Sequence, residues 1–271
     1  MLRLLLRRLL DLVVVLGIAS VFVFAVIRLI PGDPAAVIAG PNAPVETLAA
    51  IRKNLGLDEP LPIQYVIWLR GVLHGDLGTS YLAGQSVAGE IAQRFPVTVQ
   101  LAVGGMLVAI LVGVALGLLA GLHQDSPLDA AISAFNTLWL SVPTFWSGLI
   151  FLLVFALAWH VLPVGGSIPL TEDPLGAVLH LVLPSVTLGL AIAPEIAWFV
   201  RNGVLDVMGQ DYVRTARSKG LPPGLILRRH VIRNAMLPLL TVIGIQTGKV
   251  LGGAVVVECD LQSSLYSFIL R

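Results

Sequence analysis

The chain has 271 residues, of which 56% are hydrophobic and 12% are charged, and its formal net charge is +1. This composition excludes a soluble domain, and so small a net charge gives no reason to expect a nucleic-acid partner. The single cysteine, Cys259, excludes an internal disulfide framework and a Cys-based metal cluster.

Apolar runs long enough to cross a bilayer recur along the chain. Their approximate positions are 9–30, 97–122, 134–158, 179–200 and 235–257. About 20 apolar residues span a bilayer, and because lipid cannot pair an open backbone, the spans should be helices. We therefore predict an all-α fold, a polytopic membrane helical bundle with five spanning helices. Pro143, Pro184 and Pro194 should kink the third and fourth spans.

The first span follows Arg3, Arg7 and Arg8, which predicts a cytoplasmic amino terminus. Its apolar run is too long for a secretory signal peptide and lacks a cleavage site, so we expect it to be retained. Counting onward, the turn at 122–133 should be cytoplasmic although it contains no Lys or Arg. The loop at 201–234, which is rich in Lys and Arg, should be cytoplasmic as well.

The segment between the first two spans, residues 31–95, is expected to form a helical cap on the outer surface. Residues 44–55 and 62–74 have the pattern of two short helices. In the second of them, Tyr65 and Trp68 are available for the membrane interface.

Two predicted spans carry a glycine at every fourth position. These are Gly113, Gly117 and Gly121 in one span and Gly244, Gly248 and Gly252 in the other. Such spacing lets helix backbones approach closely in lipid. We expect both faces to pack against helices of this chain or of a dimer partner, and a pore-lining role is the alternative.

Two ionisable residues lie inside predicted spans, Glu195 directly after Pro194 and Lys249. A charge at such a depth is costly and therefore indicates a role. Glu195 could form a structural pair with Lys249, Arg201 or a partner chain, or the two residues could line a transport path. The scattered histidines have no metal-binding spacing, and the stretch 244–249 only superficially resembles a phosphate-binding loop. We therefore expect no enzymatic activity, cofactor or metal.

The basic loop has more internal pattern than a loop that only fixes topology or touches anionic lipid would need. Residues 203–220 suit a helix with an apolar stripe, and the glycine and proline residues at 220–224 form a sharp turn into a second, Arg-rich helix. Two short helices joined in this way make a compact projection that can enter a partner's groove.

Several motifs together indicate a family. Thr215-Ala216-Arg217-Ser218-Lys219-Gly220, with Leu237-Pro238 after the next helix, resembles the so-called EAA loop of ABC-importer permeases, although Arg-Thr-Ala-Arg stands where that name suggests Glu-Ala-Ala. Further stretches resemble the dipeptide, oligopeptide and nickel branch of these permeases. They are Arg28 to Pro34, Leu55 to Pro60 with Gln64-Tyr65, Gly75 to Ser80, and Arg94-Phe95-Pro96-Val97-Thr98. The resemblance extends from the amino terminus to Glu258.

This resemblance implies that the loop at 203–233 docks on a separate ATPase. The docking residues it assigns are Tyr212, Arg214, Ala216, Arg217, Lys219, Gly220, Leu221, Pro222 and Arg228. It also implies a heterodimer with a second permease subunit, two ATP-binding subunits, an external solute-binding protein and a place in the cell inner membrane. The solute would be a peptide or a related small solute such as nickel.

The domain organisation that follows places the first span in 1–30, the cap in 31–95 and the permease core in 96–258. The tail at 259–271 is too short and polar for the sixth span that the family has, so we expect it to be truncated. Two other functions stay open at this point. One is a proton-coupled secondary transporter that uses Glu195 as a relay, and the other is a non-transporting membrane scaffold.

Overall fold

The computed structural model describes residues 2–29, 34–40, 44–54, 56–80, 85–166, 168, 171–236 and 238–250. Every named element within these ranges is a helix, and an isolated bridge joins Thr79 to Ser86. The chain divides into two compact units, residues 1–94 and residues 95–271. Gly252, Glu258 and the tail at 259–271 lie outside the described residues.

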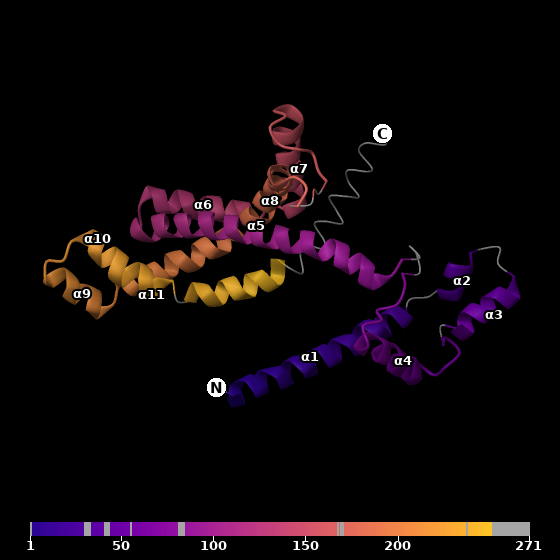
Figure 1. The fold of residues 1–271 in the computed structure, drawn as a ribbon. Helices are drawn as coiled ribbons and strands as arrows, with labels where there is room; N and C mark the ends of the chain where they lie inside the picture. The colour runs from indigo at the N-terminus through magenta and orange to yellow at the C-terminus, as the bar shows by residue number, and fades with distance from the viewer. Residues whose placement is uncertain are drawn as a thin grey trace. The chain divides into compact units, whose positions relative to one another are not determined.

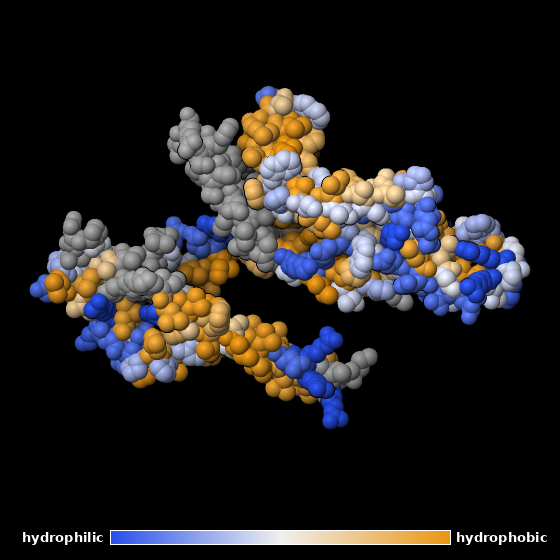
Figure 2. All heavy atoms as spheres, turned by 180° about the vertical axis from the view of Figure 1, so that it is seen from behind, coloured by the Kyte–Doolittle hydropathy of each residue, from blue (hydrophilic) through white to orange (hydrophobic). Residues whose placement is uncertain are grey.

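The first unit contains a long helix and three shorter ones (Figure 1). They are α1 (Leu2–Leu29), α2 (Pro34–Ala39), α3 (Val45–Asn54) and α4 (Leu61–Leu73). The helices predicted at 44–55 and 62–74 correspond to α3 and α4. Large apolar side chains are exposed along most of α1, as Figure 2 shows, which suits a helix surrounded by lipid.

Aromatic side chains join α4 to α1. The Tyr65 hydroxyl lies 2.8 Å from the Ser20 Oγ atom, and the Phe24 ring lies 5.4 Å from that of Tyr65 and 5.9 Å from that of Trp68. The two aromatic residues that were expected at the membrane interface therefore pack against the first long helix.

The second unit contains the remaining helices (Figure 1). They are α5 (Val87–Leu122, which begins in the first unit), α6 (Pro127–Leu140), α7 (Thr144–Phe151), η1 (Leu152–Ala158), α8 (Pro174–Met208), α9 (Asp211–Ser218), α10 (Pro223–Ile226), η2 (Leu227–Ile232) and α11 (Arg233–Ala235), and a last helix covers Pro238–Val250. The buried core joins α5, α8, the short helices α9 to α11 and the start of the last helix.

Among the described residues, 3 helices are long and apolar enough to cross a membrane, or up to 5 if each of two bent helix pairs is one span. The third predicted span is wrong in form. It was expected as one kinked helix at 134–158, whereas α6 and the helix Thr144–Ala158 meet at 100°. Pro143 precedes α7 with extended dihedral angles and has no N–H to donate, so the chain turns there instead of continuing. In contrast, α8 is one helix through Pro184 and Pro194.

The prediction of a single helix over 203–220 is also wrong. The helix α8 ends at Met208, and Gln210 takes an extended conformation before α9 begins at Asp211. The Gly209 and Gln210 N–H groups bond back to the carbonyls of Leu205 and Val207, which closes the end of α8. The apolar stripe expected on one helix is therefore divided between two.

Candidate coupling site

The short helices α9 to α11, which we call the coupling knob (residues 211–235), contribute apolar side chains to the buried core of the second unit. Val213 in α9 and Val231 in η2 are fully buried, and Ile226 in α10 lies with them. The same core includes Val204 of α8. A knob whose interior is continuous with that of the long helix can move with that helix as a unit.

The turn between α9 and α10 depends on Gly220. Its φ of +73° lies in the left-handed region that residues with a side chain rarely adopt. The Gly220 and Leu221 N–H groups bond to the carbonyls of Arg217 and Ala216, which closes the end of α9. Pro222 is extended and Pro223 begins α10, so the chain reverses direction within a few residues.

Most of the residues assigned to docking lie on the outside of the knob. The exposed ones are Tyr212, Arg214, Arg217, Lys219, Gly220, Pro222 and Arg228. Ala216 is buried and belongs to the core of the knob, and Leu221 is half-buried against that core. Figure 2 shows hydrophilic side chains at the end of the unit that carries α9 and α10. The outer surface of the knob is therefore polar and cationic above an apolar interior.

A pocket of about 320 Å³ lies where the knob meets the ends of α5 and α8. It is lined by Leu122, Met208, Arg217, Leu221, Pro223, Gly224, Ile226 and Leu227. Arg217 donates a hydrogen bond to the Met208 Sδ atom at 3.4 Å, which ties α9 to the end of α8.

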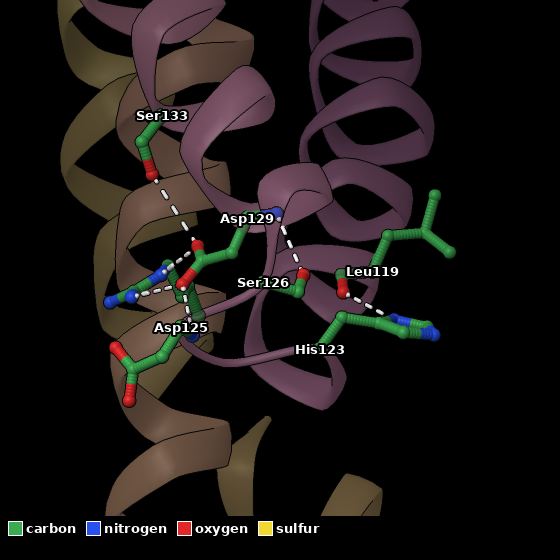
Figure 3. A network of polar contacts seen from close by, with 7 residues as sticks. Leu119, His123, Asp125, Ser126, Asp129 and Ser133 are labelled. Atoms are coloured by element: carbon green, nitrogen blue, oxygen red, sulfur yellow. Dashed lines mark hydrogen bonds and ion pairs between the residues drawn. The ribbon is translucent and has the colours of Figure 1, made fainter.

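A buried ion pair connects α6 to α8 close to the knob (Figure 3). The Arg201 Nε and Nη2 atoms donate to Oδ1 and Oδ2 of Asp129, each at 2.7 Å. The side chain of Asp129 is 6% exposed and that of Arg201 is 25% exposed. Such a two-pronged pair between a guanidinium and a carboxylate is strong and directional.

Local residues hold this carboxylate in place. The Asp125 N–H donates to Oδ2 of Asp129 at 3.1 Å, and the Ser133 hydroxyl reaches Oδ1 at 3.5 Å. Ser126 caps α6 by accepting from the Asp129 N–H. Figure 3 shows the Asp125 carboxylate pointing away from this network. The Asp129 carboxylate is therefore held by contacts within its own turn as well as by Arg201.

Sequence reasoning missed this pair. Arg201 was considered as a partner for Glu195, but it is committed to Asp129, which is 72 positions away in the sequence. One signal was present, because the turn at 122–133 contains acidic residues and no Lys or Arg. The positive charge that balances Asp129 comes from Arg201, the first residue of the basic loop predicted at 201–234.

The first glycine series lies directly against α8. A Cβ atom added at Gly113 or Gly117 would lie 2.7 Å or 2.5 Å from the carbonyl oxygen of Ala193 or Ala197, and one added at Gly121 would lie 2.9 Å from the Val204 Cβ atom. The second series differs. No atom lies within 4 Å of a Cβ atom added at Gly244 or Gly248, so neither packs against a helix of this chain in the described residues.

Glu195 and Lys249 lie together, on α8 and on the last helix. The Lys249 Nζ atom is 3.5 Å from the Glu195 Oε2 atom, and the buried Gln246 donates to the same oxygen. No group of three or more His, Cys, Asp or Glu residues that could hold a metal ion occurs in the part of the chain that the structure describes.

Comparison with known proteins gives a consistent result. Residues 113–270 match the family described as "Binding-protein-dependent transport system inner membrane component", and residues 1–102 match the N-terminal family of such membrane components. A probable peptide ABC transporter permease protein of Sinorhizobium fredii is 41% identical over 253 residues, which are 93% of this chain and 81% of that protein. A glutathione transport system permease protein of Salmonella choleraesuis is 39% identical over 258 residues, which are 95% of this chain and 82% of that protein. These findings support neither nickel transport, nor a proton-coupled carrier, nor a scaffold.

Proposed function

This chain belongs to the family of binding-protein-dependent transport system inner membrane components, and from that premise we propose that it forms, with a second permease, the membrane path for short peptides. It is a multi-pass inner-membrane protein and a permease subunit of an ABC importer, and thus a transport component and not an enzyme. Peptides are favoured as the solute because relatives are named for peptide and glutathione transport.

The partners we propose are the second permease subunit, two ATP-binding subunits and an external solute-binding protein. The amino terminus and the coupling knob would face the cytoplasm, where ATP is available, and the cap at 31–95 would face the binding protein. The distribution of Lys and Arg supports this orientation, since Arg3, Arg7 and Arg8 precede the first span and the knob is cationic.

In this proposal the knob is the part that an ATPase moves. Its exposed cations would contact the rim of a groove on the ATPase, and the turn at Gly220 and Pro222 would enter that groove. Closure of the ATPase dimer would displace the knob, and the shared core with Val204 would pass the displacement to α8. The pair between Arg201 and Asp129 would carry it on to α6, and the spans would shift between inward- and outward-open states.

One observation carries this proposal most directly: the Gly220 turn is exposed while the residues on both sides of it are anchored in a buried core. Such a hairpin offers a defined shape to a partner and transmits force inward.

The test replaces Gly220 by Val. A side chain there is strained by the φ of +73°, and because no atom lies within 4 Å of an added Cβ, it would project outward into the partner's groove. We expect ATP-coupled uptake to be abolished while membrane insertion is kept, as measured by peptide uptake in proteoliposomes and by membrane fractionation. The matched control is Gly17→Val in α1, where an added Cβ also meets no atom within 4 Å and no positive φ occurs. Unimpaired uptake by the Gly220 variant would rule out docking through this turn.

A further inference from the structure

Three polar side chains meet between α8 and the last helix, outside the coupling knob. Glu195 comes from α8, and Gln246 and Lys249 come from the last helix, Pro238–Val250. Oε2 of Glu195 receives both the Lys249 ammonium and the Gln246 amide. Charged groups inside membrane helices are costly, so a cluster of this kind indicates a function beyond packing.

The pair between Glu195 and Lys249 differs from the buried pair between Asp129 and Arg201. It rests on one contact of 3.5 Å, whereas Arg201 makes two contacts of 2.7 Å. Its side chains are 60% exposed for Lys249 and 40% exposed for Glu195. An ammonium group has three N–H donors, so Lys249 can bind a second anion while it stays near Glu195. A ligand can therefore reach the charged groups of Glu195 and Lys249, whereas burial shields those of Asp129 and Arg201.

Aromatic side chains share the Glu195 side of α8. Trp198 and Phe199 follow Glu195 by three and four positions, and both rings are exposed. This side of α8 thus combines a carboxylate, its ammonium partner and aromatic area.

We propose that Glu195 and Lys249 form a binding site for the two charged ends of a short peptide as it passes through the membrane. Glu195 binds the α-ammonium group and Lys249 the α-carboxylate, while Gln246 holds the Glu195 carboxylate in position. A zwitterion suits this site because each of its charges pairs with one of the two residues while Lys249 stays near Glu195, so no charge is left unmatched. A solute of a single sign would pair with only one of the two residues. This inference rests on the proposed function, since it names the part of the path that selects the peptide.

The test uses the full transporter in proteoliposomes, with both permeases, the ATPases and the solute-binding protein. The substrates are trialanine with free ends, its N-acetyl form and its C-terminal amide, each supplied saturating on the binding protein after its binding is measured by calorimetry. In the natural protein, uptake of the free peptide should exceed that of each capped form by at least about tenfold, the lower end of the value of one charge-assisted hydrogen bond.

The two variants should each lose one half of this selectivity. Glu195→Gln should reduce the ratio of free to N-acetylated uptake to about one and leave the ratio of free to amidated uptake unchanged. Lys249→Gln should do the reverse. Glu90→Gln, which removes a carboxylate from an exposed pair with Arg94, is the matched control and should preserve both ratios. If Glu195→Gln does not assemble, Lys249→Gln still carries the test because its side chain is largely exposed.

Two results would overturn the inference, and they differ from each other. If both variants slow the uptake of all three peptides equally, the pair only holds the helices or contacts the second permease. If the natural protein shows no ATP-dependent uptake of any peptide, the proposed function is wrong, and the proposed peptide-binding site at Glu195 and Lys249 is wrong with it.

Discussion

Replacing Asp129 by Asn tests whether the buried pair with Arg201 holds α6 to α8. The substitution keeps the size of the side chain and removes its charge, so the guanidinium loses one of two contacts of 2.7 Å and its counter-charge. Removal of one partner from a fully buried pair costs about 3–5 kcal/mol. Because the Arg201 side chain is 25% exposed, water recovers part of this cost, and we expect a loss of about 2 kcal/mol.

The assay is thermal unfolding of the purified protein in detergent, followed by size-exclusion chromatography after heating. For a chain of this size, about 2 kcal/mol corresponds to a midpoint lowered by about 4–8 °C. Asp125→Asn is the matched control, since that carboxylate is exposed and points away from the network, and the hydrogen bond from Asp125 to Asp129 comes from its backbone N–H (Figure 3). An Asn side chain also tolerates the positive φ of 58° at this position.

A double-mutant cycle separates the pair from other effects of either side chain. Asp129→Asn, Arg201→Gln and the double variant should give a coupling energy of about 1–2 kcal/mol. A coupling energy near zero, or an equal midpoint shift in the Asp125 control, would show that the two side chains do not stabilise each other and would refute the reasoning.

Two further substitutions test packing, each against a matched control. Gly117→Val places side-chain atoms within about 2.5 Å of the Ala197 carbonyl oxygen, so the permease should lose its folded population in fluorescence-detected chromatography. The control Gly17→Ala should not change the folded population. A stable Gly117 variant would contradict close packing of α5 on α8. Val231→Ala, in the core of the knob, should lower stability by about 2 kcal/mol in a thermal melt. The control Leu225→Ala, on the exposed side of α10, should leave the melt unchanged but weaken co-purification with the proposed ATPase subunits. Equal melts for Val231→Ala and Leu225→Ala would argue against a packed knob.

Sequence patterns identified the features that depend on local chemistry. Long apolar runs located the long helices, because a chain that crosses lipid must pair its backbone N–H and C=O groups internally, as a helix does. The turn at Gly220 could also be anticipated, since a glycine at the end of a helix, with Pro222 and Pro223 shortly after it, is typical of a sharp turn. The glycine series of α5 was visible because its spacing of four is the spacing of one helix face.

Features that depend on tertiary packing were not predictable in this way. No charged residue interrupts the stretch from α6 to the helix after it, so hydropathy alone joined the two, although they meet at 100°. The second glycine series has the same spacing as the first, yet Gly244 and Gly248 face open space while Gly117 meets a neighbouring carbonyl. Spacing reports which residues share a face, and only the fold decides what that face meets. The pair of Asp129 and Arg201 is missed for the same reason.

The contacts in the second unit converge on one stretch of α8. Gly113 and Gly117 pack on Ala193 and Ala197, Arg201 holds Asp129, and Val204 enters the core of the knob, so residues 193–204 join α5, α6 and the knob. A displacement of the knob must therefore move this stretch as a body, because close-packed interiors do not deform gradually. Glu195 lies on the same stretch, and its partner Lys249 lies on another helix. If α8 shifts relative to that helix, the distance between the two charges changes, so a force that the proposed ATPase applies at the knob would reach the residues proposed to bind the peptide.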